Sequence, residues 1–307
     1  MIAARGLTKV FDGRVAVEDL TFDIPEGSLC ALLGPNGAGK TTTVRMLLGV
    51  FAPSSGSAEV AGVTLPASDA DGARLRAGAG ILTESPGFYD KMSGAENLAL
   101  FGQLYGLDPA TLRTRGDYWL KRLELWDARD RLFATWSKGM KQRLALIRAV
   151  IHEPRVIFLD EPTAGLDPAG AREVRDLIAD LGKDGRTILL CTHNLVEAEE
   201  LADLVGILSR RLIAFGTEAE LTAAGPKLVV ELAGNAAGYV QGVRGTPGVV
   251  VAESTGNTLV LTLAEPAQFT PGLVRHLVGQ GAEVLAVRPL APSLEEIYLR
   301  AVHGSHP

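Results

Sequence analysis

Three almost wholly apolar runs constrain the fold of this chain more than any other feature. They are LCALLG at 29–34, VIFLDE at 156–161 and TILLCTH at 187–193, and helical patterns separate them. Strands that are apolar on both faces are typical of the centre of a parallel sheet covered by helices on each side. Each run stops at polar residues. Because open α/β sheets bind ligands at the carboxyl ends of their strands, we expect the functional residues at these stops.

The segments around these runs predict two further parts of the same domain. The alternation of Leu20, Phe22 and Ile24 with polar residues predicts a half-buried antiparallel strand. Between the first two apolar runs lies a mostly helical insertion, at about 86–153, in which Ser93 and Asp108 occupy helix-capping positions. We expect the aromatic residues of this insertion to pack in a core.

A change of composition at Gly225-Pro226 predicts a second domain. A length of 307 residues suits two domains, which we place at 1–224 and 225–307. The second reads as strand, a turn-rich stretch with room for a short helix, strand, strand, helix, strand, with a final helix opened at Ser293. This is the βαββαβ order of a ferredoxin-like α+β domain.

Composition and charge exclude several classes of protein. With 30 Lys and Arg against 36 Asp and Glu, the net charge is −6, which argues against a chain that coats nucleic acid, so we predict no nucleic-acid partner. No uncharged apolar run approaches the roughly 20 residues of a membrane span, and we expect a cytoplasmic protein. Cys30 and Cys191 lie in apolar runs without a CxxC spacing, so we interpret them as buried free thiols.

The residues that follow the first apolar run have the pattern of a phosphate-binding loop. The run from Gly34 to Thr41 fits GxxxxGK[ST], directly after a strand and before a helical pattern. Glycines let successive backbone amides point at phosphate oxygens, Lys40 would reach the β- and γ-phosphates, and Thr41 would hold Mg²⁺. A purely structural glycine turn is the alternative. The predicted nucleotide-binding residues here are Gly34, Pro35, Asn36, Gly37, Ala38, Gly39, Lys40, Thr41 and Thr42.

The stop after the second apolar run supplies two acids. Asp160 is placed to bind the Mg²⁺ shell, and Glu161 is placed to polarise a water in line with the γ-phosphate. Two acids at a strand end can also be an ordinary solvated terminus. Their occurrence beside a phosphate loop favours ATP hydrolysis.

Three more motifs complete an ordered set. WSKGMKQR at 136–143 precedes VIFLDE by a short helix, AGLD at 164–167 follows it, and Thr192-His193 ends the next strand. This set resembles the ATP-binding-cassette (ABC) ATPases over nearly all of 1–224. The resemblance implies an α/β fold with an ABC-type P-loop NTPase core, an antiparallel β subdomain and a helical insertion, with ATP and Mg²⁺ as cofactors.

The resemblance also implies roles for individual residues. In that family two head-to-tail copies sandwich the nucleotide, so a second copy of the chain is an expected partner. Lys40, Glu161 and His193 would be catalytic, with His193 sensing the γ-phosphate, and Phe11 would stack on adenine. The residues that would face the nucleotide of the second copy are Ser137, Lys138, Gly139, Met140 and Asp167.

This chain departs from the family pattern in three places. Its signature reads WSKGM rather than LSGGQ, which loses the side-chain amide at Met140. The position of the usual glutamine before Pro86 holds Glu84, which would join Thr41 and Asp160 as a Mg²⁺ ligand. The C-terminal domain is absent from minimal cassettes. Together these features resemble the ATPases of bacterial ABC-2 type exporters of the drug-efflux and sodium-extrusion group.

We therefore expect an ATP-hydrolysing subunit that energises a separate integral-membrane permease, for export of a drug, lipid or ion, and that lies at the inner face of the cell membrane through that permease. The alternative is a soluble ABC ATPase that acts on a ribosome or another non-transport partner. Ribosome-acting members usually carry two cassettes in one chain, and DNA-acting members carry long coiled coils. A non-hydrolysing cassette is disfavoured by Lys40, Asp160, Glu161 and His193.

Overall fold

A computed structural model of the chain describes residues 1–83, 87–223, 227–290 and 293–303. The chain divides into two compact units, Met1–Thr217 and Glu218–Arg300. This division comes before α8 (Glu218–Ala223), whereas the sequence analysis placed that segment in the first domain. The two boundaries differ by α8 and the residues that follow it, and Gly225 and Pro226 themselves lie outside the described residues.

A six-stranded sheet forms the centre of the first unit. Its strand order is β10-β9-β3-β8-β7-β6, and its neighbours are parallel except for the antiparallel pair β9 and β10. Every residue of β3, β7 and β8 is buried, which confirms the prediction of central parallel strands. The strand bounds are β3 (Leu29–Leu33), β6 (Ala79–Leu82), β7 (Val156–Asp160), β8 (Thr187–Thr192), β9 (Leu204–Ser209) and β10 (Arg211–Gly216).

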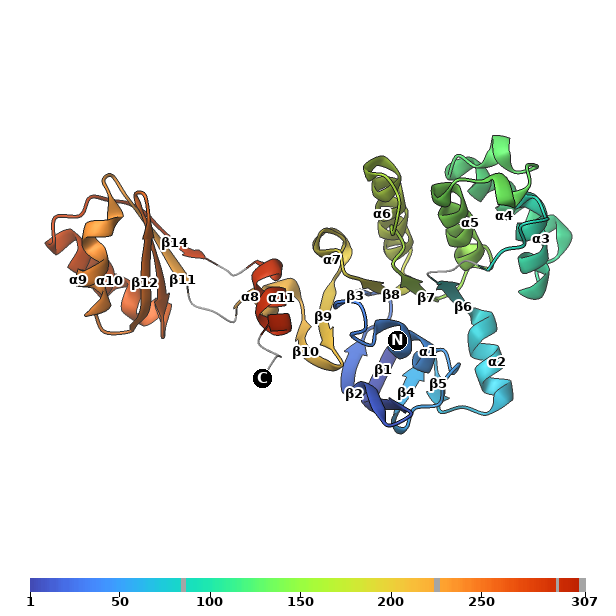
Figure 1. The fold of residues 1–307 in the computed structure, drawn as a ribbon, viewed down its shortest axis with the longest axis horizontal. Helices are drawn as coiled ribbons and strands as arrows, with labels where there is room; N and C mark the ends of the chain where they lie inside the picture. The colour runs from blue at the N-terminus through green and yellow to red at the C-terminus, as the bar shows by residue number, and fades with distance from the viewer. Residues whose placement is uncertain (84–86, 224–226, 291–292, 304–307) are drawn as a thin grey trace. The chain divides into compact units, whose positions relative to one another are not determined.

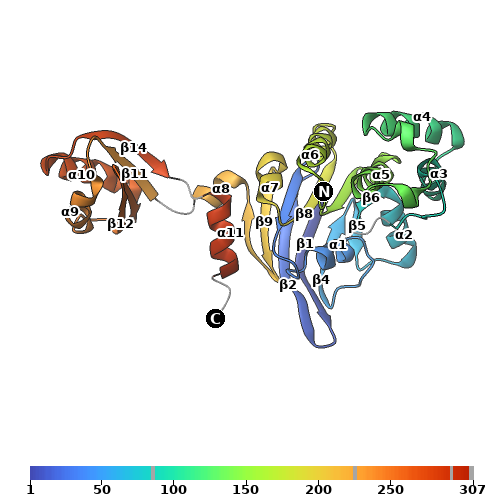
Figure 2. The same cartoon turned by 45° about the horizontal axis from the view of Figure 1, so that its top comes forward.

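Different layers cover the two faces of this sheet, as Figure 1 and Figure 2 show. One face packs against α1 (Lys40–Leu47) and a four-stranded antiparallel sheet of order β2-β1-β4-β5. The other face packs against α5 (Lys138–Val150), α6 (Pro168–Lys183) and the end of α7 (Leu195–Leu201). The antiparallel strands are β1 (Ile2–Phe11), β2 (Arg14–Ile24), β4 (Ser55–Val60) and β5 (Val63–Leu65), and α2 (Asp69–Gly78) precedes β6.

The helical insertion packs beside α5. It contains α3 (Gly94–Leu104), α4 (Pro109–Arg122) and the short 3-10 helices η1 (Trp126–Ala128) and η2 (Phe133–Thr135). Ser93 and Glu96 form the predicted reciprocal capping box, because Ser93 Oγ accepts from Glu96 N–H and Glu96 Oε2 accepts from Ser93 N–H. Trp136 fills the space beside Gly94, where an added Cβ would lie 2.3 Å from the indole ring. The start of α3 is thereby fixed against the residue that precedes Ser137.

The second unit is a four-stranded antiparallel sheet with helices on one face (Figure 1). Its strand order β12-β13-β11-β14 and its element order give the predicted ferredoxin-like arrangement. Buried aliphatic residues from the sheet and from α10 form a separate core. The elements are β11 (Lys227–Leu232), η3 (Ala236–Tyr239), α9 (Val240–Arg244), β12 (Val249–Thr255), β13 (Thr258–Leu263), α10 (Pro266–Gly279), β14 (Val284–Leu290) and α11 (Leu294–His303).

Among the helices of the described residues, none combines the length and the apolar character needed to cross a lipid bilayer.

Phe158, at the centre of β7, is fully buried in the core below the antiparallel sheet. We expect Phe158→Ala to lower the free energy of unfolding of the first unit by about 3–5 kcal/mol, because it removes buried surface and leaves a cavity. Urea denaturation followed by tryptophan fluorescence measures this unit alone, since Trp119, Trp126 and Trp136 all lie in it. Leu104→Ala is the control, because Leu104 is 72% exposed. An equal effect of both variants would contradict the placement of Phe158.

Candidate active site

The phosphate-loop residues form a tight turn between β3 and α1. Gly37 and Gly39 adopt φ values of 82° and 102°, in the left-handed region that favours glycine. At Gly39 an added Cβ would also lie 2.7 Å from the carbonyl oxygen of Ala16 on β2. The backbone therefore requires glycine at position 39. The loop ends at the first turn of α1, where unpaired helix amides favour an anion.

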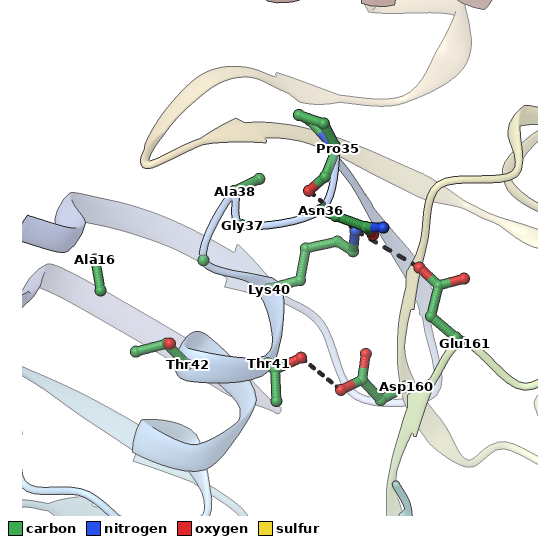
Figure 3. Close-up of a pocket in the computed structure, with 11 residues that line it drawn as sticks. Ala16, Pro35, Asn36, Gly37, Ala38, Lys40, Thr41, Thr42, Asp160 and Glu161 are labelled. Atoms are coloured by element: carbon green, nitrogen blue, oxygen red, sulfur yellow. Dashed lines mark hydrogen bonds and ion pairs between the residues drawn. The ribbon is translucent and has the colours of Figure 1, made fainter. Parts of the chain in front are cut away.

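Lys40 is the buried cation of this loop. Its side chain is 7% exposed, and Nζ donates to the carbonyl oxygens of Gly34 at 2.5 Å and Pro35 at 3.4 Å. Nζ also lies 3.6 Å from Oε1 of Glu161. Figure 3 shows the lysine side chain extended across the loop toward this carboxylate. The charge of Lys40 is thus held inside the turn and balanced by an acid from a different strand.

Thr41 and Asp160 join the loop to the end of β7. Thr41 Oγ1 donates to Asp160 Oδ2 over 2.7 Å, and Asp160 is 5% exposed (Figure 3). A hydroxyl and a carboxylate are hard oxygen ligands of the kind that Mg²⁺ prefers. Among the described residues, no cluster of three or more His, Cys, Asp or Glu could hold a metal ion. The pair suits Mg²⁺, which is commonly bound by one or two protein ligands together with substrate phosphates.

Glu161 lies between Lys40 and His193. His193 Nδ1 is 2.9 Å from Oε1 and 2.8 Å from Oε2 of Glu161, whose side chain is 17% exposed. The backbone of Glu161 has a φ of 51°, a left-handed conformation that is rare for a residue with a side chain. Its N–H donates to the carbonyl oxygen of Cys191 at the end of β8. The structure therefore brings the three predicted catalytic residues together.

A cavity of about 300 Å³ opens over Lys40 and Glu161, and His193 is not among its lining residues. The phosphate loop and the acid pair line most of it, and Ala16, which the sequence analysis missed, lies on its opposite side (Figure 3). The lining residues are Ala16, Pro35, Asn36, Gly37, Ala38, Gly39, Lys40, Thr41, Thr42, Asp160 and Glu161.

The five residues predicted to face a second copy lie outside the lining of this cavity. Ser137 caps α5, its Oγ accepting from Met140 N–H, and the Met140 side chain packs on the helical core. Asp167 caps α6 by accepting from Gly170 N–H. The Lys138 side chain lies against Gly165, and Gly139 stands in the first turn of α5.

Phe11 and Gly34 are predicted nucleotide residues that do not line this cavity. Phe11 lies at the end of β1, is 38% exposed and packs edge-to-face on Phe51, with ring centroids 5.5 Å apart. It lines a separate shallow pocket with Asp12, Arg14, Val15 and Ala16. Ala16 of β2 lines both pockets, so the pocket that contains Phe11 adjoins the cavity at the phosphate loop. Glu84 lies outside the described residues.

Two cysteines, Cys30 and Cys191, lie in the strands that lead to the site. Burial raises the pKa of the Cys30 thiol, and burial with the nearby Asp160 carboxylate raises the pKa of Cys191. Both cysteines are free, as predicted.

Gln142 on α5 donates to the carbonyl oxygens of Pro162 at 2.9 Å and Glu161 at 3.4 Å. No local pattern indicates this contact, because Gln142 resembles an ordinary polar helix residue.

Comparison with known proteins agrees with this geometry. The ABC transporter family model matches residues 17–164. The daunorubicin resistance ATP-binding protein DrrA3 of Streptomyces coeruleorubidus is 36% identical over 308 residues, a match that covers 97% of this chain and 94% of the relative. The Nod factor export ATP-binding protein I of Cupriavidus metallidurans is 34% identical, with 98% and 96% covered. The chain belongs to the ATP-binding proteins of ABC transporters.

A solved structure supports the same assignment. An ATP-binding subunit of an ABC transporter is 32% identical, with a TM-score of 0.66, over 72% of this chain and 92% of that chain. Members of this family bind and hydrolyse ATP, so the chain is an ATPase. This confirms the resemblance on which the sequence analysis relied, including its similarity to export ATPases.

Lys40→Ala should weaken ATP binding by about 10–100-fold, because it removes a charge-assisted contact to phosphate and leaves Glu161 without its cation. Titration with a fluorescent ATP analogue measures the affinity. Lys183→Ala is the matched control, since the Lys183 side chain is 77% exposed and far along α6. Unchanged affinity in Lys40→Ala would mean that the loop is a structural turn only.

Proposed function

We propose that this chain is the ATP-hydrolysing subunit of an ABC exporter, and that two copies bind ATP head to tail and drive a separate transmembrane permease. The cluster of Lys40, Glu161 and His193 beside Thr41 and Asp160 carries the proposal. Two of the relatives that match nearly the whole chain are named for drug resistance and for export, which supports the direction of transport.

The geometry suggests an exchange of partners when ATP binds. Lys40 Nζ lies 3.6 Å from Oε1 of Glu161. A γ-phosphate in the cavity would take Lys40 by charge-assisted hydrogen bonds, which releases the Glu161 carboxylate at the moment when substrate is present. His193, on the other side of Glu161, would contact the same phosphate group.

Glu161 would then act as the general base. Its carboxylate accepts a proton from a water molecule, the water oxygen attacks the γ-phosphorus, and the bond from that phosphorus to the bridging oxygen of ADP breaks. The products are ADP and inorganic phosphate. Mg²⁺, when bound, neutralises the phosphate charge that develops in this step. Thr41 and Asp160 would hold the ion, and Glu84 remains a predicted third ligand.

The position of the signature residues supports action on a second copy. Ser137 and Lys138 are exposed and do not line the cavity of their own chain. The N-terminus of α5 at Ser137 carries unpaired amides and the positive end of the helix dipole. We propose that Ser137, Lys138, Gly139, Met140 and Asp167 meet the nucleotide bound by the partner copy, and that Phe11 contacts its own adenine.

We further propose that the second unit holds two copies together when nucleotide is absent. Edge strand β12 exposes Val250 (67%) and Val251 (45%), and an exposed apolar edge is a template for pairing with another strand. A link of this kind raises the effective concentration of the two ATPase units. On this proposal the assembly lies at the inner face of the cell membrane, bound to the permease.

Glu161→Gln should keep ATP affinity but lower turnover by about 10²-fold or more, because the amide cannot accept the proton. ATP-bound dimers should accumulate, and size-exclusion chromatography with Mg-ATP measures them. Glu199→Gln, at an exposed position of α7, is the control. If Glu161→Gln stays monomeric and hydrolyses ATP at the wild-type rate, the assignment of the base is wrong.

Removal of the second unit, in a chain that ends at Thr217, should weaken dimerisation without nucleotide while ATP binding persists. Analytical ultracentrifugation over a range of concentrations compares this chain with the full-length protein. Val250→Lys in the full chain is a milder variant that places a charge on the edge of β12. Identical monomer–dimer equilibria for all three proteins would refute the tethering role.

A further inference from the structure

We propose that Thr163 and Glu197 are positioning residues for the hydrolysis step, because their hydrogen bond holds the loop that begins at Glu161. Thr163 Oγ1 donates to Glu197 Oε1. The inference rests on the proposed role of Glu161 as the base. No local motif in the sequence marks either residue.

The contact joins the two segments that carry Glu161 and His193. Thr163 follows Glu161 in the loop between β7 and α6, and Glu197 lies on α7, which begins directly after His193 and Asn194. The hydrogen bond therefore fixes the distance between the loops that leave the neighbouring strands β7 and β8. A shift of either loop would change the contact between Glu161 and His193.

The burial of Glu197 is the observation that favours a functional role. Glu197 is 1% exposed, and its second oxygen, Oε2, is buried with no hydrogen-bond partner among the described residues. A buried carboxylate with unmet hydrogen-bonding capacity destabilises the folded state, and an apolar residue of similar size would pack there at less cost. The acceptor for Thr163 is the one evident benefit of a glutamate at this position.

The same loop is held from its other side. Gln142 on α5 is 6% exposed, and its Nε2 donates to the carbonyl oxygens of Pro162 and Glu161. The loop is therefore held by α5, which begins at Lys138 directly after Ser137, and by α7, which begins at Leu195, two residues after His193.

The backbone of Glu161 explains why the loop needs these restraints. Its φ of 51° is a strained conformation for a glutamate, and such conformations persist only where the surrounding structure imposes them. Loss of the Thr163 contact would let the loop relax and would displace the carboxylate from its place beside Lys40 and His193. The expected defect lies in the chemical step rather than in the binding of ATP.

The test uses full-length protein and two matched pairs of variants. Thr163→Val and Glu197→Leu remove the donor or the acceptor with little change of volume, whereas Thr163→Ser and Glu197→Gln keep them. We expect the first pair to lower kcat by about 10–100-fold with little change in KM for ATP, as for a misplaced catalytic group. The conservative pair should retain turnover near that of wild type.

The double variant Thr163→Val/Glu197→Leu separates positioning from stability. It leaves no buried polar group unpaired, so its melting temperature should recover, while kcat should stay as low as in the single variants. Recovery of kcat together with the melting temperature would overturn the proposal, because the contact would then be structural only. Equal changes in kcat and KM, or no change in either single variant, would overturn it as well.

Glu200→Gln is the control for general disturbance of α7. Glu200 pairs with Arg175 of α6 and is about half exposed, so the variant removes the charge from a contact between α6 and α7 without touching the loop. It should behave as wild type. The measurements also separate this inference from the function on which it rests. If wild type hydrolyses ATP and Glu161→Gln does not, a full-rate Thr163→Val refutes the positioning role alone.

Discussion

The site depends on the strand order β3-β8-β7, because this order places three loops at one edge of the sheet. The phosphate loop follows β3, His193 follows β8 and the acid pair ends in the turn after β7. Parallel pairing requires that all three strands point their carboxyl ends the same way. Complete burial of the strands makes that arrangement rigid, since both faces are closed by packed side chains. The distances among Lys40, Glu161 and His193 are a result of this framework.

Charge balance is a second property of the same edge. Lys40 is buried at a point where an unpaired ammonium group would destabilise the fold, and Glu161 supplies the opposite charge from another loop. Thr41 and Asp160 also come from two different segments, and a hydrogen bond pairs them. These polar groups are therefore satisfied within the chain, and the groups that pair with one another are those that we propose for the nucleotide and Mg²⁺.

The sequence predicted the central strands and the phosphate loop because their physical requirements are local. Burial on both faces forces continuous apolar runs, and the turn needs glycine at fixed positions such as Gly39. Capping pairs such as Ser93 with Glu96 are local as well. By contrast, the antiparallel subdomain was predicted only as a whole and the residues of β1, β4 and β5 were not, and register shifts interrupt simple alternation where β1 pairs with β2 and β4. The contact of Thr163 with Glu197 joins residues 34 positions apart, and nothing near either residue indicates the other.

The two buried cysteines provide a way to measure how often the central sheet opens. Cys30 on β3 and Cys191 on β8 are both 1% exposed or less, and their raised pKa values keep the thiols protonated and unreactive while the sheet is closed. A thiol reagent can reach them only when the strands that carry the phosphate loop and His193 separate. The rate of labelling at each of the two cysteines under native conditions therefore measures how often the central sheet opens, without any enzymatic assay. A ligand that joins the loops of β3, β8 and β7 would slow that labelling in proportion to the stability that it adds.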